Sequence, residues 1–250
     1  MRRKTKIVCT IGPATDSEIM IEKLIDAGMN VARLNFSHGN KDEHRRRIRM
    51  IREVAQRMNR FVGIMADTKG PEIRTGEFEN GAQVFKRGDI VMIHRESILG
   101  TQQGFHISTP QLFEDISAGD YLLIDDGKMR LNVLDVQKDV LKCQVHNSGI
   151  IKSRKGVNVP NVKLSMPFIS QKDDEDIRFA AEEGVDLIAA SFVRRPEDIM
   201  AIRAILSEVH GESIELVAKI ENQEGMDNLE AILEVSDGIM VARGDLGVEV

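Results

Sequence analysis

The strongest constraint on this chain is a repeated pairing of a short apolar segment with a longer amphipathic one. Apolar segments begin near residues 6, 31, 61, 186, 214 and 238. Where these pairs follow one another directly, their starts lie about 24 to 30 residues apart, a spacing typical of a strand followed by a helix. A series of such βα units predicts a parallel β-sheet covered by helices, which is an α/β fold.

One interruption divides this series. The third and fourth strands are separated by about 95 residues more than a βα unit needs. From about Ile73 to Val159 the sequence consists of short β-type segments separated by turn residues, a pattern typical of a small all-β domain. We therefore expect residues 1–72 to form the first part of the α/β domain, residues 73–159 an inserted β-barrel domain, and residues 160–250 the second part of the α/β domain.

Two architectures fit six βα units. One is a doubly wound open sheet, and the other is a (β/α)8 TIM-type barrel that stops before its last two strands, because a closed barrel takes about 250 residues by itself. We favour the incomplete barrel with the inserted all-β domain after strand three. The last residues, Gly247–Val250, suggest no docking helix. Strands one and six would then be open edges, so we expect this chain alone to be aggregation-prone and inactive.

Charge and composition exclude several classes of function. The net charge is -6 and the only basic run is His44–Arg49, so no nucleic-acid partner is predicted. The two cysteines, Cys9 and Cys143, form neither a disulfide framework nor a metal cluster. No apolar run has membrane-spanning length, and no apolar segment of the signal-peptide kind follows the basic start Met1–Lys4. We expect a cytoplasmic protein without a membrane partner.

Charged and polar residues gather where the predicted strands end. A parallel strand that is buried on both faces should be apolar, yet four of these strands finish in polar side chains. Residues two apart share a strand face, and the groups are Arg33, Asn35 and Ser37; Asp67 and Thr68; Lys219 and Glu221; and Arg243 and Asp245. This end of the sheet is where α/β enzymes bind ligands. The alternative is that these side chains only form ion pairs with one another at this end of the sheet. Burying so many charges without a ligand is costly, which argues against that alternative.

The residue types narrow the chemistry. Glu221 and Asp245 are two carboxylates of the kind that hold Mg²⁺ together with water and substrate oxygens. Lys219 can neutralise charge on a transferring phosphoryl group or a developing enolate, and Arg33 offers a planar fork for phosphate. The oxygens of Asn35, Ser37, Asp67 and Thr68 suit a monovalent cation. This set fits phosphoryl transfer, and no P-loop, G-x-G-x-x-G motif or Ser-His-Asp set competes with it.

The same segments resemble those of the pyruvate kinase family. The matching stretches are TKIVCTIGP (5–13), NVARLNFSHG (30–39), DTKGPEIRT (67–75), KGVNVP (155–160), KIENQEG (219–225) and SDGIMVARGDLG (236–247). They occur in the family's order and span the whole chain. The family continues beyond them into two more barrel strands, a substrate-binding threonine and a C-terminal regulatory and assembly domain.

The resemblance implies a phosphotransferase of the last step of glycolysis, which moves the phosphoryl group of phosphoenolpyruvate to ADP and gives pyruvate and ATP. Arg33 and Lys219 would be catalytic and would bind substrate together with Gly244 and Asp245. Potassium would be held by Asn35, Ser37, Asp67 and Thr68, and Mg²⁺ (or Mn²⁺) by Glu221 and Asp245. Nucleotide would be bound by Asn35, Phe36, Ser37, His38, Arg74 and Lys155. Glu72 resembles the potassium-dependent members.

The resemblance also implies a lid and an assembly. The inserted β domain would close over substrate and exclude water, and the full-length protein would be a homotetramer. Two other functions remain open at this point. One is a magnesium-dependent pyruvate or phosphoenolpyruvate lyase on a similar barrel, which would not need Arg74 and Lys155 because it has no ADP to hold. The other is a non-catalytic truncated paralogue.

Overall fold

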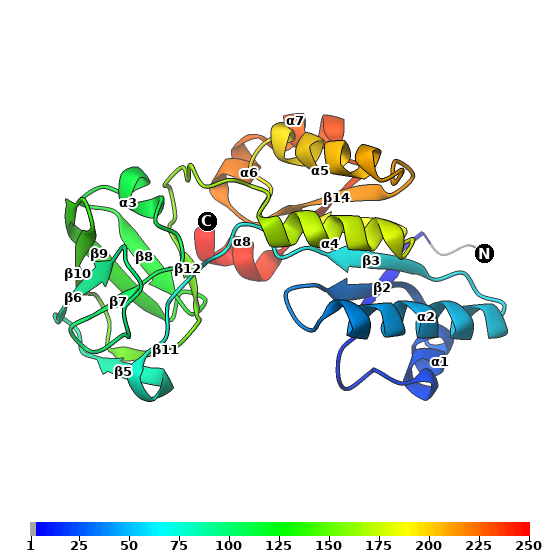
Figure 1. Ribbon diagram of the computed structural model, residues 1–250, viewed down its shortest axis with the longest axis horizontal. Helices are drawn as coiled ribbons and strands as arrows, with labels where there is room; N and C mark the ends of the chain where they lie inside the picture. Colours follow the sequence, from blue (N-terminus) through cyan, green and yellow to red (C-terminus); the bar gives the residue numbers. More distant parts are fainter. Residues whose placement is uncertain (1–3) are drawn as a thin grey trace. The chain divides into compact units, whose positions relative to one another are not determined.

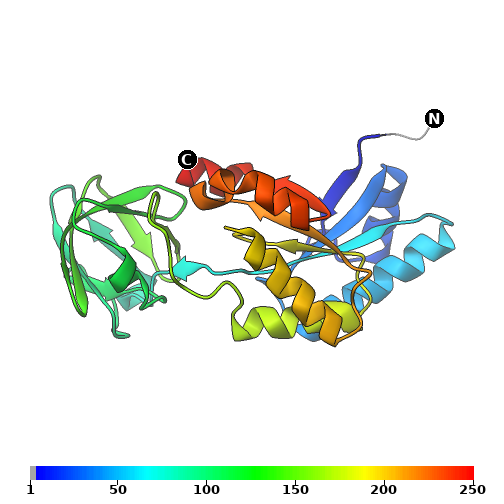
Figure 2. The same ribbon diagram turned by 90° about the horizontal axis from the view of Figure 1, so that it is seen from above.

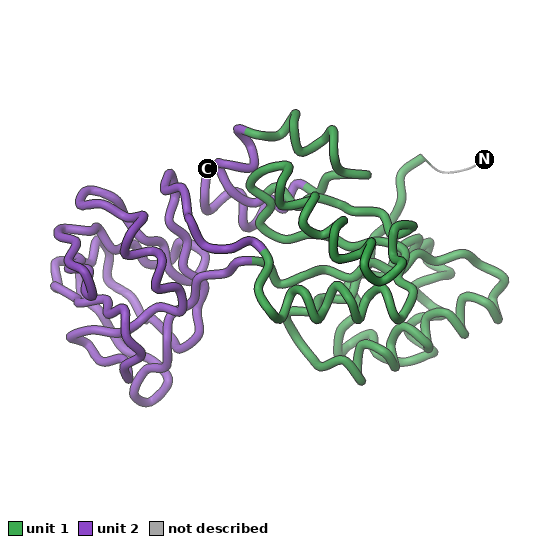
Figure 3. The backbone as a smooth tube through the Cα atoms, turned by 45° about the horizontal axis from the view of Figure 1, so that its top comes forward, with its two compact units in different colours: residues 1–70, 169–220, 228–240 green, residues 71–168, 221–227, 241–250 purple. Residues whose placement is uncertain are grey.

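The computed structural model describes residues 4–250, which divide into two compact units (Figure 3). Unit 1 comprises the chain up to Gly70 together with residues 169–220 and 228–240, and unit 2 comprises residues 71–168, 221–227 and 241–250. Met1–Arg3, at the start where no signal peptide is expected, lie outside the described residues. Each unit is described by itself.

Unit 1 is built on a six-stranded sheet whose strands lie in the order β1-β2-β3-β13-β14-β15. The strands are β1 (Ile7–Thr10), β2 (Met29–Asn35), β3 (Gly63–Asp67), β13 (Leu187–Ala190), β14 (Glu215–Ile220) and β15 (Gly238–Val241). The neighbours from β1 to β14 pair in parallel. Each new strand is added beside the previous one, whereas a doubly wound sheet reverses its order at a switch point. The sheet also curls (Figure 2), so the barrel-type alternative is the one observed.

Helices follow the strands and pack beside one another along the sheet (Figures 1 and 2). They are α1 (Glu18–Asp26), α2 (Lys41–Arg57), α4 (Gln171–Glu182), α5 (Pro196–Glu208) and α7 (Leu229–Val235). Ser17 caps α1, Asn40 and Ser170 begin capping boxes, and Pro196 fills the first position of α5. These local signals fix where each helix starts. Because each helix follows its strand along the chain, the helix starts lie toward the carboxyl ends of the strands, as the βα pattern predicts.

Unit 2 consists mainly of short strands around an apolar core. Its seven-stranded sheet has the order β4-β12-β8-β9-β10-β6-β7, and β11 pairs with β5 in a second sheet. The strands are β4 (Ile73–Arg74), β5 (Ala82–Phe85), β6 (Ile90–His94), β7 (Gly104–His106), β8 (Tyr121–Ile124), β9 (Met129–Gln137), β10 (Val140–Val145), β11 (Gly149–Lys152) and β12 (Gly156–Asn158). A 3-10 turn at Glu79–Gly81 and the short helix α3 (Leu112–Asp115) complete this stretch. The rings of Phe78, Phe85 and Phe105 meet in its core, with centroids 5.1 to 6.3 Å apart.

The expectation for the last part of the chain is wrong. After β14 the chain forms two helices, α6 (Gln223–Asp227) and α7, separated at Asn228. Residues 243–249, where Arg243 and Asp245 were expected to share a strand face and no helix was expected, form helix α8 (Arg243–Glu249). Asp245 lies in the first turn of α8, where a carboxylate favours a helix because it faces the positive end of the helix dipole. Residues two apart point in different directions on a helix, so Arg243 and Asp245 do not share a face.

Within residues 4–250, none of the helices combines the length and the apolar character that crossing a membrane requires.

Candidate active site

The polar strand ends of unit 1 converge on the carboxylate of Asp67. Asp67 ends β3, and its side chain is only 2% exposed. Arg33, on the neighbouring strand β2, forms an ion pair with Asp67 and donates from Nε to Oδ2 at 2.5 Å. The same guanidinium donates to Thr10 Oγ1 at the end of β1 at 2.9 Å. The side chain of Arg33 keeps 27% of its surface exposed, so it can still reach a ligand.

Lys219 approaches the other oxygen of the same carboxylate. It lies on β14, and its ammonium is 3.1 Å from Asp67 Oδ1. The Lys219 side chain is 9% exposed, so a charged ammonium is held in a largely buried place. A buried cation needs nearby anionic or polar oxygens to offset its loss of hydration. Asp67 therefore orients two cations, Arg33 and Lys219, from opposite sides.

The sequence analysis missed Ser191, which belongs to the same network. It follows β13, is 3% exposed, and its hydroxyl lies 2.7 Å from Lys219 Nζ and 3.1 Å from Asp67 Oδ1. Its backbone amide donates to Thr68 Oγ1 at 3.2 Å, and its hydroxyl also lies 2.7 Å from the Thr68 carbonyl. The sequence did contain an indication of this role, because Ser191 interrupts an apolar run at the end of a strand, where a polar residue is unexpected. A single neutral hydroxyl is much less conspicuous there than a charge.

The predicted loop residues Asn35–His38 leave the end of β2 beside this network. The Asn35 side chain accepts a hydrogen bond from the Ser37 amide at 3.0 Å, and the Phe36 amide donates to the Asp67 carbonyl at 2.9 Å. The Phe36 ring is 2% exposed and packs against the rings of His44 and Phe179 at centroid distances of 4.4 and 5.9 Å. A ligand can therefore reach Phe36 only through its backbone.

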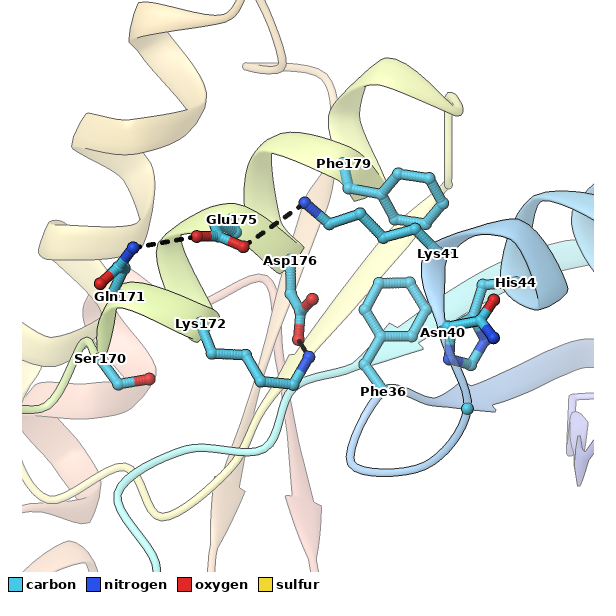
Figure 4. Close-up of a pocket in the computed structure, with 11 residues that line it drawn as sticks. Phe36, Asn40, Lys41, His44, Ser170, Gln171, Lys172, Glu175, Asp176 and Phe179 are labelled. Carbon is cyan, nitrogen blue, oxygen red and sulfur yellow. Dashed lines mark hydrogen bonds and ion pairs between the residues drawn. The ribbon is translucent and has the colours of Figure 1, made fainter.

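A pocket of about 580 Å³ lies on the other side of Phe36 and His44, between the first turns of α2 and α4 (Figure 4). Its wall contains paired charges: Lys172 donates to Asp176 at 2.7 Å, and Lys41 lies 3.7 Å from Glu175. The pocket is therefore balanced in charge and distinct from the Asp67 network.

His44, on α2, holds the Asn35–His38 loop by a hydrogen bond. Its Nε2 lies 2.9 Å from the His38 carbonyl, so the neutral ring donates there, while Nδ1 is buried without a hydrogen-bond partner in the described chain. Burial lowers the pKa of His44 below its usual value of 6.5. The unfolded chain takes up this proton more readily, so folding stability falls as the pH drops below about 6.5.

We expect the urea midpoint of the wild-type protein to fall more between pH 7.5 and pH 5.5 than that of His44→Gln, because glutamine cannot take up the proton. Urea titrations of both proteins at the two pH values check this. An equal fall in both would show that His44 does not contribute to the pH dependence.

Two further predicted residues, Arg74 and Lys155, lie in unit 2, and each is held by a carboxylate of that unit. Arg74 on β4 donates to both oxygens of Glu72, at 2.9 and 3.0 Å. The Lys155 ammonium lies 2.8 Å from Asp125 Oδ1. The hydrogen bond from Lys155, joined by one from Lys128, holds the pKa of Asp125 below its usual value. Both cations are thus ordered by a carboxylate of their own unit and remain partly exposed, at 35% for Arg74 and 36% for Lys155.

The two predicted magnesium ligands also belong to unit 2. Glu221 directly follows β14 and is fully buried, and Asp245 lies exposed in the first turn of α8 beside Gly244. Among the residues that the structure describes, no group of three or more histidine, cysteine, aspartate or glutamate side chains could hold a metal. A pair of carboxylates is nevertheless a sufficient protein contribution for Mg²⁺, which keeps waters and substrate oxygens in its shell.

Comparison with known proteins identifies the family. The family model described as pyruvate kinase, barrel domain, matches residues 2–250. The chain belongs to the pyruvate kinase barrel-domain family. It is 56% identical over 250 residues to a pyruvate kinase of Staphylococcus aureus and 54% identical over 250 residues to one of Staphylococcus epidermidis. These alignments cover 99% of this chain and 43% of each relative, so the chain spans less than half the length of these curated relatives.

A solved structure supports the same family. The crystal structure of a pyruvate kinase from Cryptosporidium parvum superposes with a TM-score of 0.94 and is 44% identical. The match covers 99% of this chain and 52% of that one. The α/β barrel-type fold favoured in the sequence analysis is therefore confirmed, and the curled parallel sheet of unit 1 is the part of the pyruvate kinase barrel that this chain contains.

Proposed function

We propose that this chain supplies the phosphoryl-transfer site of a pyruvate kinase, which moves the phosphoryl group of phosphoenolpyruvate to ADP and yields pyruvate and ATP. The observation that carries the proposal is the Asp67 network, in which one buried carboxylate aligns Arg33 and Lys219. Two cations fixed at the carboxyl ends of parallel strands suit a substrate that carries a phosphate and develops negative charge as it reacts. Membership of the family supports the same reaction.

Two residues of unit 1 have different roles, one in binding substrate and the other in stabilising the transition state. Arg33 binds the substrate phosphate, because its planar fork suits phosphate and part of it stays exposed. A terminal oxygen of ADP attacks phosphorus, and the bond from phosphorus to the enol oxygen breaks. The Lys219 ammonium stabilises negative charge on the transferring group and on the departing enolate. The enolate takes a proton at its methylene carbon, which completes pyruvate.

Metal ions complete the proposed site. Glu221 and Asp245 hold Mg²⁺ or Mn²⁺, whose positive charge neutralises phosphate oxygens when bound. Asn35, Ser37, Asp67 and Thr68 hold K⁺, since their oxygens are of the neutral and anionic kinds that alkali cations accept. Glu72, the partner of Arg74, fits a potassium-dependent member because no internal cation replaces the ion there. The backbone amides of Gly244 and Asp245 bind the substrate carboxylate.

Unit 2 contributes residues that bind the nucleotide. We assign Arg74 and Lys155, with the loop Asn35–His38, to ADP, and we assign residues 73–159 to a lid domain that excludes water during transfer. Residues 1–72 and 160–250 are the two parts of the barrel domain. A homotetramer acting in the cytoplasm completes the proposal for the full-length gene product, without a nucleic-acid or membrane partner.

A coupled assay with lactate dehydrogenase tests the proposal. The full-length gene product, with Mg²⁺ and K⁺, should form pyruvate from phosphoenolpyruvate only when ADP is present. Pyruvate formation at an equal rate without ADP would instead indicate a lyase. No pyruvate under any condition would indicate a non-catalytic paralogue.

Lys155→Ala should raise the KM for ADP by about 10-fold while the KM for phosphoenolpyruvate changes little, because one charge-assisted contact to phosphate is lost. Steady-state kinetics with each substrate varied in turn measure this. Lys128→Ala is the matched control, because Lys128 also pairs with Asp125, at 2.9 Å, but has no assigned ligand. Equal effects of the two substitutions would remove Lys155 from the nucleotide site.

A further inference from the structure

We propose that Ser191 is a positioning residue that fixes the ammonium of Lys219 for phosphoryl transfer. This inference rests on the proposed function. Ser191 and Lys219 are cross-strand neighbours, because Ala190 pairs with Ala218 in the register of β13 and β14 and each residue follows its strand partner by one. The Ser191 hydroxyl is 2.7 Å from Lys219 Nζ, which is shorter than the 3.1 Å from that ammonium to Asp67 Oδ1.

The surroundings determine which way this hydroxyl points. Two acceptors lie within reach of its single proton, the Thr68 carbonyl at 2.7 Å and Asp67 Oδ1 at 3.1 Å. The Lys219 ammonium can only donate, so a lone pair of the hydroxyl is directed toward Lys219. The Ser191 amide donates to Thr68 Oγ1, and Thr68 Oγ1 lies 3.4 Å from the Ala189 carbonyl. Ser191 is therefore anchored to β3 by both its backbone and its side chain. It presents an acceptor, and not a donor, to the ammonium.

The backbone on both sides of this contact is unusually constrained. Phe192, the next residue, has φ of 57°, a left-handed conformation that is strained for a bulky side chain. Gly70 also has positive φ, and a Cβ there would lie 2.7 Å from the Ser191 carbonyl oxygen and 3.0 Å from its Cβ. The chain thus passes close over Ser191 at a position where only glycine fits. Strain and close approach at one residue are typical of a site that holds a functional group in place.

These contacts assign Asp67 and Ser191 different roles at Lys219. Asp67 supplies the charge that keeps the ammonium stable, and it is shared with Arg33. Ser191 supplies direction, because it is neutral and its orientation is set by Thr68 and Asp67 on the neighbouring strand end. Without the hydroxyl, the ammonium would keep its charge partner but could swing toward the carboxylate and away from the reacting group. A displacement of about 1 Å is enough to lower a rate about 100-fold.

A double-mutant cycle in the full-length gene product tests this role. Ser191→Ala should lower kcat by about 10- to 100-fold, as expected for losing a hydrogen bond to a charged group. In a Lys219→Ala background the same substitution should change kcat by less than about 2-fold, because the group that it positions is gone. Ser236→Ala is the matched control: its hydroxyl also bonds a backbone carbonyl, Ile232 O, at 2.7 Å, and kcat should stay unchanged.

A second pair of variants covers the case in which alanine prevents folding. Ser191→Thr keeps the hydroxyl and Ser191→Val removes it at nearly equal volume, so the threonine variant should retain at least about 10-fold more kcat. Equal activities of these two, or equal losses from Ser191→Ala in both backgrounds, would overturn the positioning role alone. A normal kcat in Lys219→Ala would overturn the proposed function together with this inference.

Discussion

Replacement of Lys219 by alanine is expected to lower kcat by about 10²- to 10⁴-fold in the full-length gene product, with metal binding largely intact. The Lys219 side chain is 9% exposed and its ammonium contacts Asp67 and Ser191, so it is already oriented before substrate arrives. A group that is oriented in advance stabilises developing charge without reorganisation, so its removal lowers kcat strongly. Steady-state kinetics at saturating phosphoenolpyruvate and ADP measure the effect.

Lys23→Ala provides the control for this experiment, because Lys23 is exposed in the last turn of α1. It should leave kcat within about 2-fold of the wild-type value, since surface substitutions rarely matter. Mn²⁺ binding, followed by electron paramagnetic resonance, should be nearly equal in the wild-type and Lys219→Ala proteins. A near-normal kcat in Lys219→Ala would remove the ammonium from the mechanism.

Asp67→Asn should destabilise the strands around it by about 3 kcal/mol, because it removes the buried negative charge that Arg33 and the largely buried Lys219 share. Asparagine has nearly the same shape and keeps a carbonyl acceptor, so the change removes charge more than packing. Arg33 and Lys219 both lose their shared partner, and Lys219 has little access to water. Hydrogen–deuterium exchange of peptides from β2 and β3 should accelerate by about 100-fold.

The control for Asp67→Asn is another aspartate–arginine pair, in which the aspartate is exposed instead of buried. Asp42 is 93% exposed and lies 3.1 Å from Arg45 Nη1, and Asp42→Asn should cost less than about 0.5 kcal/mol. Equal protection of β2 and β3 in the wild-type and Asp67→Asn proteins would show that the network does not stabilise unit 1.

Strand periodicity predicted most of unit 1 because its signals are local. Apolar segments of four to seven residues became strands, and local caps at Ser17, Asn40 and Ser170 begin the helices that follow the apolar segments. The barrel-type strand order could not be read from spacing, because open and closed sheets use the same βα units. The observed order, in which each strand is added beside the last, decides it.

The limits of sequence reasoning also have physical causes. The common end of the parallel strands placed Arg33 and Asp67 in one group, and the two form an ion pair, but the strand pattern could not reveal that one carboxylate serves two cations. Ser191 escaped notice because its importance comes from a partner on another strand. Asp245 was placed on a strand face because its helix, α8, begins only two residues after β15 ends.

The ratio of ATP to pyruvate tests the central claim most directly. The full-length gene product should be incubated with phosphoenolpyruvate, ADP, Mg²⁺ and K⁺, with ATP measured by luciferase and pyruvate by lactate dehydrogenase. Direct transfer between the two substrates predicts one ATP for each pyruvate, and both products should fall together in Lys219→Ala. Pyruvate released with inorganic phosphate and no ATP would contradict the account.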